Sequence, residues 1–259
     1  MTHWSLDRYS AEILTQTDLL RALLREADPA APVPTCPEWN LGQLMRHVGG
    51  AHRWVDTIVR TRATEEVPHD LVDEVFGYGD EDPAVLDAWL AEGARGLTDA
   101  LTEAGPARVW TVVPDQPLAF WARRMLHETV VHRADAAGAV GARYEVAPAV
   151  ARDALDEWMS FGAVPEAYLP SAAGPLLGPG RTLGFRATDD PAGAWFVDLT
   201  GDVPRWRRGG GEAAVSVLGP LSELVLLVYG RPPGVGTEVR GDRELLGLWV
   251  ERTGFWLHE

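Results

Sequence analysis

Lysine is missing from this chain of 259 residues, and cysteine occurs only once, at Cys36. Every basic side chain other than histidine is therefore an arginine. Together with the abundant alanine and glycine, this is typical of a GC-rich genome and needs no functional explanation. A single cysteine excludes an internal disulfide framework and suits a reducing compartment, so we expect a cytoplasmic protein.

Positive charge and long apolar runs are also scarce. The 23 arginines face 38 acidic residues, and the net charge of −15 would repel a nucleic-acid backbone, so no nucleic-acid partner is expected. No apolar run approaches the length that crosses a bilayer. The N-terminal segment carries Asp7 and Glu12, so we expect neither a signal peptide nor a membrane partner.

The first half of the chain has the apolar periodicity of helices. Asn40 with Gln43 resembles a capping box, Asp82-Pro83 is a helix start, and Gly138 follows the last apolar position. Four helices of this length predict an antiparallel bundle whose core can host a metal. The predicted helices are Ser5–Ala27, Leu41–Arg62, Ala84–Leu101 and Leu118–Ala137.

The pattern changes after Gly138 to a helix, a Pro/Gly-rich stretch over Pro165–Gly180 and several short β-like runs. Gly209–Gly211 is interpreted as a hairpin turn, since no strand-to-helix phosphate motif surrounds it. We therefore predict an α+β protein with a helical domain over 1–145 and a smaller α+β domain over 146–259. The predicted elements are helices Pro148–Phe161, Pro220–Tyr229 and Arg243–Leu257, and strands Thr182–Ala187, Ala194–Thr200, Arg205–Arg208 and Ala213–Leu218.

Two metal-capable side chains, Glu128 and His132, lie four residues apart, so both project from one face of the predicted fourth helix. The second helix carries His47 at an inward-facing position. Across two packed helices, one carboxylate and two imidazoles would form a three-ligand site with open coordination positions, as catalytic divalent metals require. Asp135 follows His132 by three residues and is either a hydrogen-bond acceptor that orients this ligand or a salt-bridge partner of a nearby arginine.

Two segments, Val33–His47 (VPTCPEWNLGQLMRH) and Arg124–Asp135 (RMLHETVVHRAD), resemble the mycothiol-dependent maleylpyruvate isomerase family, as does the terminal LLVYGRP at 226–232. The resemblance implies a DinB-like metal-binding four-helix bundle followed by a sterol-carrier-like α+β domain. It also implies that His47, Glu128 and His132 are the metal ligands.

The implied function is that of an enzyme in which a divalent ion activates mycothiol for attack on a small electrophile. Zinc suits these ligands best, and nickel or another ion is compatible. The pattern does not separate a cis–trans isomerase from a thiol transferase. Arg231 is the predicted contact for an anionic substrate. Two alternatives stay open: a non-catalytic bundle that binds metal or a small molecule, and a metal hydrolase.

The remaining candidates are interpreted as structural. Cys36 is expected to be a small buried hydrophobe, and Trp39 and Trp54 core residues. His52 is expected to face away from His47 as a packed or solvated residue. We expect His127 to lie at the surface or between helices, and Arg123 and Arg124 to lie on solvated faces of their helix.

Overall fold

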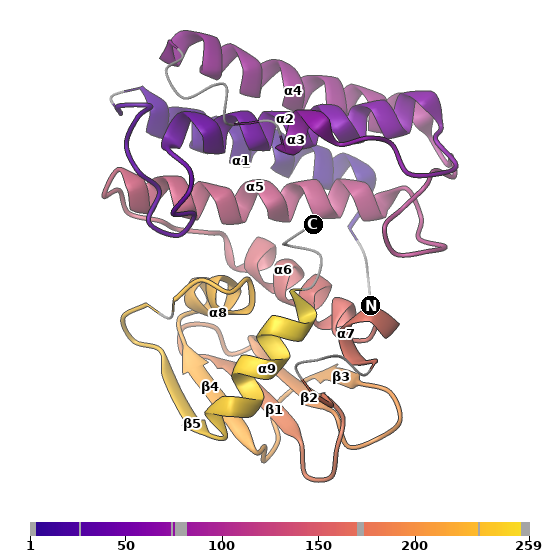
Figure 1. Cartoon of the computed structure of the whole chain (residues 1–259), viewed down its shortest axis with the longest axis vertical. Helices are drawn as coiled ribbons and strands as arrows, with labels where there is room; N and C mark the ends of the chain where they lie inside the picture. The colour runs from indigo at the N-terminus through magenta and orange to yellow at the C-terminus, as the bar shows by residue number, and fades with distance from the viewer. Residues whose placement is uncertain are drawn as a thin grey trace. The chain divides into compact units, whose positions relative to one another are not determined.

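The computed structural model describes residues 4–25, 27–73, 75, 82–169, 174–232 and 234–254. The chain divides into two compact units, Met1–Tyr144 and Glu145–Glu259 (Figure 1). The first unit is helical and the second combines helices with a sheet, which confirms the predicted α+β class.

The first unit contains four long helices and one short one. They are α1 (Leu6–Leu24), α2 (Leu41–Thr61), α3 (Asp70–Asp73), α4 (Pro83–Ala104) and α5 (Ala119–Ala139). The short helix α3 was not predicted. The predicted first helix extended to Ala27, but α1 ends at Leu24, and residue 26 lies outside the described residues.

Local sequence signals explain where these helices begin. Asn40 accepts a hydrogen bond from the Gln43 backbone while the Gln43 side chain accepts one from the Asn40 backbone, so the predicted capping box is present. Asp82 caps α4 ahead of Pro83, and Gly105 follows its last residue with a φ of +59°, which favours glycine.

Helices α2 and α5 are neighbours in the bundle, and each also packs against one other long helix. Their contacts run in opposite directions along the chain: His47 meets His132, His52 meets Thr129 and Trp54 meets Trp121. The two helices are therefore antiparallel. This pairing places the predicted ligands of both helices at one level of the bundle.

The second unit contains helices α6 (Pro148–Phe161), α7 (Pro165–Tyr168), α8 (Leu221–Val228) and α9 (Arg243–Thr253). Its sheet has the order β3-β2-β1-β4-β5, in which β1 and β4 are parallel and the other pairs antiparallel. The strands are β1 (Thr182–Ala187), β2 (Ala194–Asp198), β3 (Arg205–Arg208), β4 (Val215–Gly219) and β5 (Glu238–Gly241).

The structure of this unit differs from the prediction at a turn and at two short elements, and parts of two predicted segments lie outside the described residues. Gly209–Gly211 does not form a hairpin turn, because β3 pairs with β2 whereas β4 pairs with β1, so the glycines begin a crossover. Strand β5 and helix α7 were missed, the latter inside the stretch predicted to be irregular. Residues 170–173 of that stretch and 255–257 of the predicted last helix lie outside the described residues.

One face of the sheet carries the core of the second unit. Phe185 and Trp195 are directly paired on β1 and β2, and both are buried. Phe185 packs on Trp249 of α9, and the Trp195 indole donates to Asp156 of α6. Because paired residues share a face, α6 and α9 cover the same side of the sheet.

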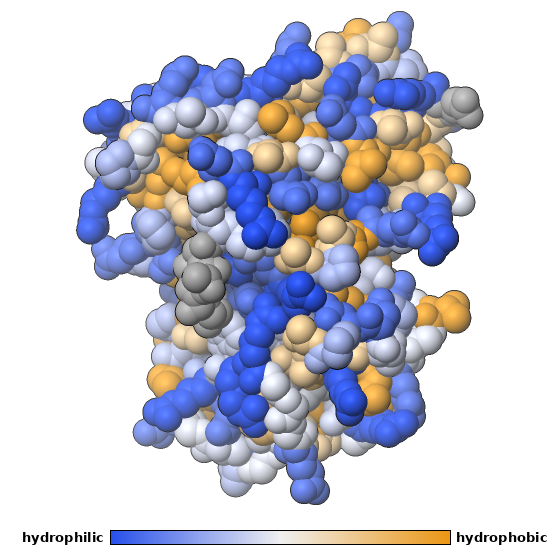
Figure 2. Space-filling model, turned by 180° about the vertical axis from the view of Figure 1, so that it is seen from behind, coloured by the Kyte–Doolittle hydropathy of each residue, from blue (hydrophilic) through white to orange (hydrophobic). Residues whose placement is uncertain are grey.

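The described part of the chain contains no helix with both the length and the apolarity to cross a bilayer. Among the described residues, the exposed large apolar side chains include Leu14, Leu19 and Val85. The face of the molecule shown in Figure 2 carries both hydrophobic and hydrophilic residues. Single exposed apolar residues of this kind are ordinary on a protein surface.

Candidate metal centre

Helices α2 and α5 bring His47, Glu128 and His132 together. Glu128 Oε1 lies 3.1 Å from His47 Nε2 and 3.0 Å from His132 Nε2. The two imidazole rings are edge to face, with centroids 4.9 Å apart. One carboxylate oxygen and two ring nitrogens thus converge on one small volume.

The other nitrogen of each imidazole has its own acceptor. His47 Nδ1 lies 3.1 Å from the Val72 carbonyl oxygen, and His132 Nδ1 lies 2.9 Å from Asp135 Oδ2. Carbonyl and carboxylate oxygens only accept, so both Nδ1 atoms carry the proton. Nε2 of each ring is then the nitrogen that faces Glu128 Oε1, and in the neutral ring its lone pair would be available to an ion held there. Histidines that bind a metal through Nε2 are held by the same kind of contact from Nδ1–H to an oxygen.

The negative charge of the Glu128 carboxylate is balanced within the cluster by the protonated imidazole of His132. Burial favours the neutral acid, but the positive charge of His132, hydrogen bonds from both imidazoles and Arg124 outweigh it and hold the pKa of Glu128 well below its usual range. Burial likewise lowers the pKa of His132, but Glu128, Asp135 and Cys36 raise it well above its usual value overall. A bound cation would take the place of this imidazolium charge.

The donor set fits a divalent ion. The three ligand atoms lie within 4.8 Å of one another, and the side chains of His47, Glu128 and His132 are only 14%, 16% and 10% exposed. Two imidazoles and a carboxylate suit zinc and its first-row neighbours. Three protein ligands also leave a coordination position for a substrate.

Arg124 engages the second oxygen of Glu128. Its Nη2 donates to Glu128 Oε2 over 3.1 Å from one turn earlier on α5, and its side chain is buried. Oε1 is thereby left facing the two histidines. The expectation of solvated faces is wrong for Arg123 and Arg124, because both are buried.

The loop between α1 and α2 lies beside His132 and contacts its partner Asp135. Thr35 Oγ1 donates to Asp135 Oδ1 over 2.6 Å, and Cys36 Sγ lies 3.8 Å from Asp135 Oδ2. Trp39 packs on His47 with ring centroids 4.7 Å apart. Sequence reasoning treated Cys36 and Trp39 as core residues and overlooked Thr35. Only their position just before the helix that carries His47 hinted at this arrangement.

The remaining histidine candidates are structural, as predicted for His52. Its Nε2 lies 2.9 Å from Thr129 Oγ1, away from the ligand cluster, and burial lowers its pKa to about 4. His127 is fully buried on α5, which excludes the surface alternative.

Arg231 belongs to the second unit, where it follows α8. Its Nη1 donates to the Tyr229 carbonyl over 2.9 Å. The catalytic role predicted for Arg231 stays a prediction.

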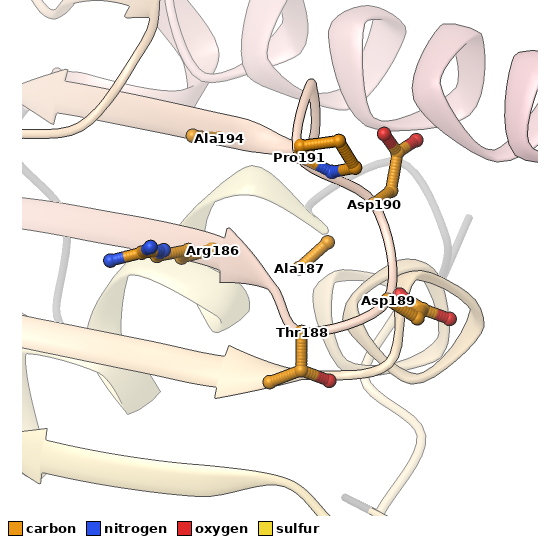
Figure 3. A pocket seen from close by; sticks show the side chains of 8 residues that line it. Arg186, Ala187, Thr188, Asp189, Asp190, Pro191 and Ala194 are labelled. Atoms are coloured by element: carbon orange, nitrogen blue, oxygen red, sulfur yellow. The ribbon is translucent and has the colours of Figure 1, made fainter.

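The second unit also has a pocket of about 360 Å³ at the turn between β1 and β2 (Figure 3). Its carboxylates have structural partners: Asp189 accepts from the Leu221 backbone at the start of α8, and Asp190 pairs with Arg152 of α6. A ligand would have to break these contacts, so we do not assign the function to this pocket.

The fold and the cluster together define a helical bundle with a convergent imidazole–carboxylate triad, joined to a mixed α/β unit. Residues 10–137 match the mycothiol maleylpyruvate isomerase N-terminal domain, and residues 149–248 match the MDMPI C-terminal domain. The chain belongs to the mycothiol-dependent maleylpyruvate isomerase family.

Two solved structures share this fold over almost the whole chain. The crystal structure of the mycothiol-dependent maleylpyruvate isomerase is 20% identical in sequence, and that of a histidine-to-alanine mutant is 19% identical. Each match has a TM-score of 0.63 and covers 92% of this chain and 95% of the other. A comparison with curated protein sequences gives no match.

Proposed function

We propose that this protein is a metal-dependent enzyme that uses a small thiol, mycothiol, to attack an electrophilic carbon of a small-molecule substrate. The observation that carries the proposal is the convergence of His47 Nε2, His132 Nε2 and Glu128 Oε1, with both Nδ1 atoms held by acceptors. Membership of the family supports mycothiol as the thiol.

In this proposal His47, Glu128 and His132 hold one divalent ion, with zinc the best fit to the donor set and nickel compatible. When bound, such an ion lowers the pKa of a coordinated thiol, as it does that of water, so that thiolate is available at neutral pH. The chain itself supplies no cysteine among these three ligands, which fits a thiol brought in from outside.

The residues around the triad would position it. Val72 and Asp135 fix the ring orientation and tautomer of the two histidines. Arg124 holds Glu128 Oε2, so that Glu128 offers the ion one oxygen and leaves more of the coordination sphere open. Trp39 covers one side of His47 and limits access of water.

Thiolate addition to a conjugated cis double bond leaves a single bond that can rotate. Elimination of the same thiolate then gives the trans isomer and regenerates the thiol, so nothing is consumed. A transferase would release the adduct after protonation instead. Arg231 is proposed to bind an anionic group of the electrophile through its guanidinium.

We propose a cytoplasmic location, because the free Cys36 and a thiol cosubstrate both suit a reducing compartment. We also propose that residues 1–145 and 146–259 act as two domains of one enzyme. The partners are then small molecules only.

The test compares thiol-dependent turnover of a maleyl-type cis-dicarboxylate by the zinc-loaded parent, His132→Ala and His69→Ala. His69 is an imidazole of the same unit outside the triad, so its removal controls for a general effect of losing a histidine. We expect His132→Ala alone to lose zinc and turnover while keeping its helical circular dichroism.

Turnover with mycothiol but not glutathione would support the proposed cosubstrate. Unchanged turnover by metal-free His132→Ala would reject metal activation of the thiol. Hydrolysis of an ester or amide without any thiol would favour the metal hydrolase, and absence of both reactions would favour the non-catalytic binding protein.

A further inference from the structure

Cys36, His132 and Asp135 form a second cluster of potential metal ligands on the opposite side of the His132 ring from Glu128. Asp135 Oδ2 lies 2.9 Å from His132 Nδ1 and 3.8 Å from Cys36 Sγ, and one ligand atom from each residue lies within 4.8 Å of the others. The cluster thus combines a thiol, an imidazole and a carboxylate. The proposed enzyme function uses the Nε2 side of His132 and assigns no role to this thiol.

The loop that carries Cys36 is held in place by its own backbone. Pro32 and Asn40 form a β-bridge, the Val33 amide donates to Trp39 O over 3.0 Å, and the Cys36 amide donates to Val33 O over 3.0 Å. Thr35 Oγ1 ties the loop to Asp135 Oδ1. Sγ is therefore positioned before any ligand arrives, and Cys36 is a free, half-buried cysteine.

We propose that Cys36, His132 and Asp135 bind a thiophilic divalent ion, such as cadmium or excess zinc. Zinc binds sulfur at about 2.3 Å and carboxylate oxygen at about 2.0–2.2 Å, so one ion bridges two such atoms up to roughly 4.3–4.5 Å apart. The 3.8 Å between Cys36 Sγ and Asp135 Oδ2 lies inside this range. Thiolate and carboxylate together balance the charge of a divalent ion.

The two clusters share one imidazole, and a neutral imidazole can bind an ion for only one of them at a time. A neutral imidazole has one protonated nitrogen and one nitrogen with a free lone pair. With the proton on Nδ1, the lone pair of Nε2 serves the triad of His47, Glu128 and His132. An ion at Cys36 needs the lone pair of Nδ1, so the proton moves to Nε2 and the triad loses a ligand. The second site is therefore inhibitory.

A cadmium titration followed by ultraviolet absorption tests the proposal, because thiolate bound to cadmium gives a charge-transfer band and this chain has only one cysteine. We expect the band to saturate at one equivalent in the parent and in His47→Ala, which lacks a triad ligand but keeps the second site. We expect no band in Cys36→Ser. Methylthiolation of Cys36 in the parent should also abolish the band, which avoids reliance on a substitution.

Metal analysis at saturation tests the exclusivity. One ion per parent chain, cadmium at the second site or zinc at the triad, is the expected result. No band in the parent would overturn the site, and a band with two ions bound per chain would overturn the exclusivity.

The inhibitory role is tested by the cadmium concentration that halves turnover, which is measured separately from turnover itself. Cys36→Ser should keep zinc and mycothiol-dependent turnover. It should need at least about tenfold more cadmium for half-inhibition, since even the loss of a hydrogen bond to a metal ligand costs this much in affinity. Equal sensitivity to cadmium would overturn the inhibitory role. If metal-free parent shows the cadmium band but zinc-loaded parent has no turnover, the proposed function alone would be rejected.

Discussion

Asp135→Asn is the substitution that best separates an organised metal site from a chance cluster of polar side chains. Asp135 is 2% exposed, and its Oδ2 accepts from His132 Nδ1 over 2.9 Å. Asparagine has nearly the same shape, but a neutral amide holds the Nδ1 proton less strongly and can present its NH2 group instead. His132 would then lose both its fixed tautomer and part of its basicity.

Loss of the hydrogen bond that holds a metal-binding histidine costs about 10–100-fold in metal affinity, or roughly 1.4–2.7 kcal/mol. The measurement is competition for zinc between the protein and a chromophoric chelator at fixed pH, with circular dichroism as a check on folding. Thr35→Ala is the matched control, because it removes only the contact to Asp135 Oδ1 and leaves Oδ2 facing His132. We expect Thr35→Ala to have the smaller effect.

If the zinc affinity of Asp135→Asn stays within about twofold of the parent, Asp135 does not support metal binding through His132. The His132–Asp135 contact would then be an ordinary buried hydrogen bond.

Three further predictions concern other parts of the molecule. Arg231→Ala should raise KM for an anionic electrophile without releasing metal, and an unchanged KM would remove Arg231 from the site. His52 stays neutral in the folded chain because burial lowers its pKa from 6.5 to about 4, whereas the unfolded chain takes up the proton below 6.5. The free energy of unfolding therefore falls as the pH drops from 6.5 toward 4. Between about pH 7 and pH 5, urea titrations should show a loss about 2 kcal/mol larger for the parent than for His52→Gln. Equal losses would show that burial does not keep His52 neutral. Gly49→Ala would place a Cβ 2.2 Å from Trp89 Nε1, so the free energy of unfolding should fall by about 1–3 kcal/mol, and an unchanged value would show that Trp89 moves freely.

Signals confined to a few neighbouring residues predicted much of the fold. The capping box at Asn40 and Gln43 and the Asp82-Pro83 start are read from adjacent positions, and both begin helices as expected. Glu128 and His132 share a face because of helix geometry alone. Helix α3 and strand β5 were missed because each has only four residues, too few for a periodic pattern.

Contacts between distant residues were not predictable in the same way. Thr35 and Cys36 meet Asp135 across about a hundred positions, and nothing near Cys36 in the sequence indicates a carboxylate partner. The burial of Arg124 likewise depends on how the helices pack. Gly209–Gly211 has the composition of a hairpin turn, and the strand order, which is a property of the whole sheet, decides against it.

X-ray absorption spectroscopy at the zinc edge, with and without mycothiol, tests whether the thiol binds to a metal held by the triad. The sample is Cys36→Ser with one equivalent of zinc, so that the protein contributes no cysteine sulfur. We expect only nitrogen and oxygen ligands at about 2.0–2.2 Å before mycothiol is added, and one sulfur at about 2.3 Å afterwards. A nitrogen and oxygen shell that stays unchanged at saturating mycothiol would contradict activation of the thiol by the metal.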